Sequence, residues 1–105
     1  MDNYIVKELT GYFNVQNKKA FDFYKRTLDY YALTIVLEGS LTYIVDDTKY
    51  VVRKNDAIFL KPGMTREGHR QNNKPLWHVT FNFLLNDDFD LSLPTYLPNS
   101  FSGEY

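Results

Sequence analysis

Apolar and polar side chains alternate along the middle of the chain. In residues 31–38, Tyr31, Leu33 and Ile35 alternate with smaller or polar neighbours, and Gly39 ends the run. A period of two residues is typical of a β-strand, whose successive side chains point to opposite faces of a sheet. Similar short runs follow at residues 41–45, 49–53 and 57–60, separated by turn-forming residues. Several short strands at this spacing predict an all-β sandwich or barrel.

Residues 76–85 predict the last clear strand, and its two faces differ in chemistry. One face carries Trp77, Val79, Phe81 and Phe83, and the other carries Leu76, His78, Thr80 and Asn82. The second face is unusually polar for a core strand. If the strand closes a barrel, His78 faces the lumen and can act as a pocket donor. The alternative is a structural histidine whose ring nitrogens bond to neighbouring polar groups.

The patterns outside these strands are weaker. Residues 4–9 are compatible with an edge strand or an extended arm, Thr10-Gly11 with a turn, and residues 12–15 with a second short strand. The aromatic content of residues 21–24 favours a strand, although a helix over residues 18–28 is the competing interpretation. The polar segment 64–73 is expected to hold a short strand or a rim loop. Two prolines and scattered apolar residues in 91–105 indicate a linker or a fraying end.

Length and composition narrow the class of protein. A chain of 105 residues indicates one domain, and 17% aromatic residues favour pleated, half-buried surfaces. The net charge of −1 argues against a nucleic-acid contact within this segment. Without cysteine, disulfides and thiolate metal sites are excluded. With no signal-peptide pattern and no membrane-length apolar run, these features favour a cytoplasmic location.

Four short motifs carry a resemblance to a known family. They are LTIVLEG at residues 33–39, DDTKYVVRKN at 46–55, DAIFLKPG at 56–63 and WHVTFNF at 77–83. In this order they resemble a small cupin barrel and, more narrowly, the N-terminal ligand-binding domain of AraC-type transcription regulators. The resemblance implies a cupin-like double-stranded β-helix, or jelly roll, that binds a small and often sugar-like effector. It divides the chain into an N-terminal arm and edge strand (1–20), a barrel (21–85) and a linker (86–105).

The same resemblance implies partners beyond this segment. A C-terminal domain with two helix-turn-helix units, not contained in the 105 residues, is expected to make the DNA contact. An N-terminal arm is expected to close over the effector, and a homodimer is possible. No membrane partner is expected.

Many cupins bind a metal, so the residues at the positions of their metal ligands indicate whether this chain can bind one. Their ligands are two histidines and a glutamate on one hairpin and a histidine on a later strand. Here the hairpin at residues 40–49 reads SLTYIVDDTK, and the later position falls near Met64–Arg66, so neither contains a histidine. His69 and His78 are the only histidines. We therefore expect no metal and no cofactor.

The predicted ligand-binding residues are His78, Thr80, Asn82, Arg26, Arg66 and Trp77. The resemblance implies that an arginine near Arg26 can hold a ligand hydroxyl or carboxylate, against the alternative of a surface side chain. Arg66 and Glu67 either pair with each other or line the barrel mouth. Trp77 is either a core residue or a platform for the ligand.

No catalytic motif or acid–base pair is apparent, so no catalytic residue is expected. The leading hypothesis is an effector-sensing domain. The alternatives are a metal-free cupin enzyme acting on a sugar, and a dimerisation module with a filled barrel.

Overall fold

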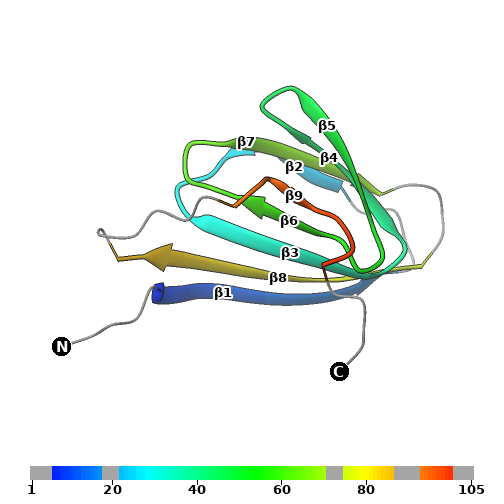
Figure 1. Cartoon of the computed structure of the whole chain (residues 1–105), viewed down its shortest axis with the longest axis horizontal. Helices are drawn as coiled ribbons and strands as arrows, with labels where there is room; N and C mark the ends of the chain where they lie inside the picture. Colours follow the sequence, from blue (N-terminus) through cyan, green and yellow to red (C-terminus); the bar gives the residue numbers. More distant parts are fainter. Residues whose placement is uncertain (1–5, 18–21, 71–74, 87–92, 101–105) are drawn as a thin grey trace.

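The strands of the chain form two antiparallel sheets. The computed structural model describes residues 6–17, 22–70, 75–86 and 93–100, and within these ranges it contains strands and no helix (Figure 1). Accordingly, no helix in the described ranges has the length and apolarity to cross a membrane. The strands are β1 (Val6–Asn17), β2 (Asp22–Thr27), β3 (Tyr31–Glu38), β4 (Ser40–Val45), β5 (Thr48–Arg53), β6 (Ala57–Leu60), β7 (Thr65–Arg70), β8 (Leu76–Leu85) and β9 (Tyr96–Leu97).

Strand pairing confirms the predicted fold class. One sheet has five strands in the order β1-β8-β3-β6-β9, and the other has four in the order β2-β7-β4-β5 (Figure 1). Apart from β4 and β5, neighbours in the order are not consecutive in sequence, so the chain crosses repeatedly between the sheets. This arrangement is a cupin-like jelly roll.

The hydrophobic core lies between the two sheets. Its fully buried side chains include Val36 on β3, Leu41 on β4, Val52 on β5 and Ile58 on β6. Each buried side chain of this size contributes about 1.5–3 kcal/mol relative to exposure. The alternation along this strand corresponds to two different faces: Ala32, Thr34 and Val36 are buried, whereas the odd-numbered positions of β3 are only partly buried.

Local chemistry explains the tight turns. Asp46 and Asp47 connect β4 to β5 with φ angles of 47° and 70°. Two left-handed residues in a two-residue hairpin match the right-handed twist of the flanking strands. Gly39 has a φ of 81°, and a Cβ there would collide with the backbone carbonyl of Pro75. Both its conformation and its surroundings therefore require glycine.

The N-terminal elements differ from the prediction. Residues 6–17 form one continuous strand, β1, so the expected turn at Thr10-Gly11 is wrong. The register against β8 shifts between Leu9 and Gly11, which is a β-bulge. A Cβ on Gly11 would lie 2.9 Å from the Phe13 ring, so this glycine reflects crowding within a strand. In contrast, the strand interpretation of the next segment is confirmed by β2, and the short strand expected in the polar segment is β7.

Part of the segment expected to be a linker is docked on the barrel. Strand β9 pairs with β6, and the amide of Phe59 donates to the carbonyl of Thr95 at 2.8 Å. The carboxylate of Asp56 accepts hydrogen bonds from the Tyr96 hydroxyl (2.8 Å), the Asn99 amide (2.7 Å) and the Arg53 amide (2.8 Å). Burial favours a higher pKa for Asp56, but these hydrogen bonds outweigh it and lower the pKa.

Candidate functional site

A cavity of about 260 Å³ lies between the two sheets. It is slightly smaller than the roughly 300–1,000 Å³ of most ligand sites, which suits a small molecule. Strands β1, β2, β3, β4, β6, β7 and β8 and the β2–β3 connection all contribute to its wall. The lining residues are Phe13, Val15, Arg26, Leu28, Tyr30, Ala32, Thr34, Tyr43, Leu60, Arg66, His78, Thr80 and Asn82.

The polar face of β8 forms one wall of this cavity. His78, Thr80 and Asn82 alternate with residues of the opposite face and all line the cavity. His78 is only 1% exposed. Five of the six predicted ligand-binding residues are thus brought together, because Arg26 and Arg66 line the same cavity. That they bind a ligand stays a prediction.

A chain of hydroxyl groups continues the polar wall across the cavity. The Thr34 and Thr80 hydroxyls are 2.8 Å apart, and the Tyr43 hydroxyl donates to Thr34 over 3.5 Å. Three of the lining residues, Thr34, Tyr43 and Tyr30, are not among those predicted from the sequence. Thr34 was detectable as the polar member of the inward-facing positions of residues 31–38. Nothing in the local sequence distinguishes Tyr43 from the other tyrosines.

Burial sets the protonation of the cavity's titratable groups. It lowers the pKa of His78 from 6.5 to about 4, so the imidazole is neutral near pH 7. A neutral imidazole offers one donor and one acceptor. Burial raises the pKa of Tyr43, against the opposing effects of the Thr34 hydrogen bond and the positive charge of Arg66. Both groups are therefore uncharged hydrogen-bonding groups at neutral pH.

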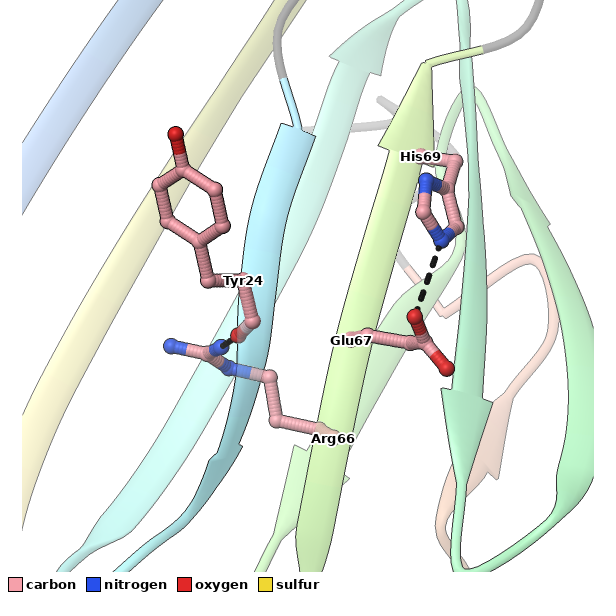
Figure 2. A network of polar contacts seen from close by, with 4 residues as sticks. All are labelled: Tyr24, Arg66, Glu67 and His69. Carbon is pink, nitrogen blue, oxygen red and sulfur yellow. Dashed lines mark hydrogen bonds and ion pairs between the residues drawn. The ribbon is translucent and has the colours of Figure 1, made fainter.

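Arg66 and Glu67 take opposite sides of β7. Figure 2 shows their side chains diverging, with the Arg66 Nη1 donating to the Tyr24 carbonyl at 2.6 Å. The Glu67 carboxylate instead lies 3.2 Å from the His69 Nε2 (Figure 2). Arg66 therefore lines the barrel cavity and does not point towards Glu67.

Arg26 reaches the cavity from the neighbouring strand. Its guanidinium carbon is 5.7 Å from the centroid of the Tyr30 ring, within the range of a cation–π interaction. Antiparallel pairing of β2 with β7 places Arg26 directly opposite Arg66. The two cationic side chains therefore share one part of the cavity wall.

Trp77 is not part of the cavity. It lies on the other face of β8 from His78, and its indole N–H donates to the Asn14 side chain at 2.7 Å. The interpretation of Trp77 as a platform for a ligand in the lumen is therefore corrected. Successive side chains of a strand point to opposite faces, so Trp77 and His78 cannot both face the cavity.

The donors in the cavity do not fit a cupin metal centre. His78 is the one histidine among the lining residues, and its described neighbours there are hydroxyls, an amide and two guanidiniums. No cluster of three histidine, aspartate or glutamate side chains suited to a metal occurs in the described part of the chain. A centre built from histidines and a carboxylate therefore has no counterpart among the lining residues that the structure describes.

Comparisons with known proteins agree on the fold. Residues 11–90 match the family model described as the AraC-like ligand binding domain. The chain is similar to an RmlC-like cupin from Shewanella frigidimarina, with a TM-score of 0.58 and 17% identity over 75% of this chain and 71% of that chain. No curated protein sequence matches significantly.

Two further solved structures are similar. The cupin domain of Drosophila melanogaster CENP-C matches with a TM-score of 0.63 and 13% identity over 72% of this chain and 62% of that chain. YhaK from Escherichia coli matches with a TM-score of 0.63 and 18% identity over 91% of this chain and 46% of that chain. At these identities, the likeness shows a shared cupin fold alone.

Proposed function

Because the chain belongs to the family of AraC-like ligand-binding domains, we propose that it senses a small, sugar-like effector for a transcription regulator. The observation that carries the proposal is the cavity between the sheets, whose wall combines aromatic surface with a row of polar groups. Aromatic faces pack against the C–H faces of a sugar, and the polar groups match its hydroxyls.

Each part of the wall has a proposed role. His78 and Asn82 offer both donors and acceptors, so they suit hydroxyls, which also donate and accept. The linked hydroxyls of Thr34 and Thr80 provide a fixed polar edge. Tyr30 and Phe13 supply aromatic surface on other parts of the wall. A ligand in this position contacts both sheets, so its binding stabilises their packing.

We propose that the domain binds its effector without converting it. The alternative is a metal-free cupin enzyme, such as a sugar epimerase. Such an enzyme needs a general base whose pKa lies near the working pH. The buried histidine, with a pKa near 4, is a weak base for this purpose. The alternative of a filled barrel is disfavoured by the cavity itself.

The remaining parts of the proposal follow from the family. DNA binding belongs to a C-terminal domain with helix-turn-helix units, and the domain described here contributes sensing and possible homodimerisation. The working location is the cytoplasm, where such a regulator meets its DNA.

A ligand screen tests the proposal. Thermal unfolding of the purified domain is followed with a panel of neutral sugars and small acids, and every hit is confirmed by calorimetry. The proposal expects at least one compound to bind with one site per chain. Incubation of the hit with the protein, followed by NMR of the small molecule, separates sensing from catalysis, because turnover would support the enzyme. A panel without any binder would contradict the sensing role.

A further inference from the structure

We propose that the edge strand β1 pairs with β1 of a second copy of this chain, through residues 11–17 and around a two-fold axis at Asn14. Strand β1 lies at one edge of the five-stranded sheet (Figure 1), so the pairing joins the two copies' sheets edge to edge. The inference assigns a surface to homodimerisation and does not depend on the identity of the effector.

Strand β1 is one of four strands that lie at sheet edges in the described part of the chain. An unpaired edge presents a row of backbone N–H and C=O groups to other chains, so proteins protect it with charged side chains, proline or a very short strand. The other three edges have this protection. Strand β9 has two residues, β2 carries the exposed Lys25, and β5 carries the exposed Lys49 and Arg53.

Residues 11–17 of β1 lack such protection. Their sequence, GYFNVQN, contains neither a charged residue nor proline. The register against β8 is irregular before Gly11 and unbroken from Gly11 to Asn17. Bulges therefore blunt only the first part of the strand, and the second part is a regular edge. Tyr12 and Phe13 are each 51% exposed, so two large aromatic side chains meet solvent along this edge.

The segment is complementary to itself, which favours a second copy as the partner. Asn14 is the midpoint of the regular edge. In an antiparallel pair centred there, Phe13 lies opposite Val15 of the second copy, and Tyr12 lies opposite Gln16. Aromatic and β-branched side chains that face each other in this way stabilise an antiparallel pair, and no like charges are opposed. Such a two-fold contact uses the same surface of both copies and closes on itself.

The two faces of the edge meet matching faces of the second copy. Phe13 and Val15 line the cavity between the sheets, and Tyr12, Asn14 and Gln16 lie on the opposite face of β1. The Tyr12 ring is 5.1 Å from that of Phe81, centroid to centroid, so the outer aromatic surface reaches the edge. Pairing at β1 therefore continues the backbone ladder and covers apolar surface on both faces.

The length of the edge sets the strength of the dimer. Residues 11–17 are fewer than the roughly 20–30 residues that each side of a standard stable interface contributes. The dimer is therefore weak, and we expect it to form at concentrations on the order of 100 μM rather than 1 μM.

Opposed charges at the axis test the pairing by sedimentation equilibrium over this concentration range. Asn14→Asp keeps a side-chain oxygen for the Trp77 indole N–H, which Asn14 accepts at 2.7 Å, but it places two carboxylates opposite each other. Thr10→Lys is the matched control, because Thr10 is exposed on the same strand but precedes the regular edge. We expect wild type and Thr10→Lys to dimerise, and Asn14→Asp and Asn14→Lys to associate at least about tenfold more weakly. An equimolar mixture of the two Asn14 variants restores the dimer.

A disulfide measures the register independently of charge. The chain has no cysteine, so a single introduced cysteine can pair only between copies. Residues opposite each other in an antiparallel pair have Cα atoms about 4.5–5.5 Å apart, within the span of a disulfide. Under mild oxidation Asn14→Cys is expected to cross-link with itself. Tyr12→Cys and Gln16→Cys cross-link with each other when mixed, and Thr10→Cys stays monomeric.

Each other outcome contradicts the inference. A chain that stays monomeric throughout the concentration range overturns it and leaves effector sensing intact. A dimer that Asn14→Asp leaves unchanged uses a different surface. Cross-linking of Thr10→Cys as fast as that of Asn14→Cys refutes the axis at Asn14. Assemblies that grow beyond a dimer also refute it, because a two-fold pair occupies the edge of both copies.

Discussion

The protonation of His78 gives a prediction whose size follows from the structure. The pKa of this histidine is lowered from 6.5 to about 4 by burial. Above pH 6.5 the imidazole is neutral in both the folded and the unfolded chain, so it costs nothing. As the pH falls from 6.5 towards 4, the unfolded chain takes up a proton that the folded chain refuses, and stability is lost. Between about pH 7 and about pH 5 this loss amounts to about 2 kcal/mol.

Urea denaturation of wild-type protein and His78→Gln at the two pH values measures this loss. Carboxylates contribute to the pH dependence of both proteins, so the difference between them isolates the histidine. We expect wild type to lose about 2 kcal/mol more than His78→Gln. Asn82→Ala controls for disturbance of the cavity wall without changing titration, and it should behave as wild type does. Equal losses in wild type and His78→Gln would refute the assignment of a buried, neutral histidine.

Four further predictions follow from other contacts. His78→Ala should leave the fold nearly as stable as wild type at neutral pH but weaken binding of a ligand found in the screen by about 1.5–3 kcal/mol, measured by calorimetry. Asp56→Asn should cost about 1–3 kcal/mol in urea denaturation and speed hydrogen exchange at Asn99, whereas Asp47→Asn in an exposed turn should do neither. Gly39→Ala should destabilise clearly more than Gly63→Ala, which costs about 1–2 kcal/mol, because both have positive φ but only Gly39 faces a backbone carbonyl. Elemental analysis of protein purified without chelator should find no stoichiometric transition metal. About one metal ion per chain, lost on mutation of His78, would contradict the conclusion that the donors in the cavity do not fit a metal centre.

The strands from residue 31 to 60 could be predicted because local and global preferences agree there. Alternation, turn chemistry and burial all indicate the same elements. The division of β8 into two faces was equally accessible, since one period-two pattern places His78, Thr80 and Asn82 together. The pattern alone did not decide whether that face meets solvent or a lumen.

The rest required tertiary information. Gly11 suggested a turn because local sequence does not show that Phe13 crowds it within a strand. The docking of residues 93–100 depends on Asp56, which is about forty positions away in sequence and accepts hydrogen bonds from Tyr96 and Asn99. The pairing of Arg26 with Arg66 also depends on a long-range register that no short motif encodes.

The central claim is that a small effector binds between the two sheets. The most direct measurement is an NMR titration of the labelled domain with the tightest ligand from the screen. The account predicts that the largest chemical-shift changes fall on His78, Thr80 and Asn82 and on the arginines opposite them. Changes confined to the outer face of β8, around Trp77 and Asn14, would contradict it.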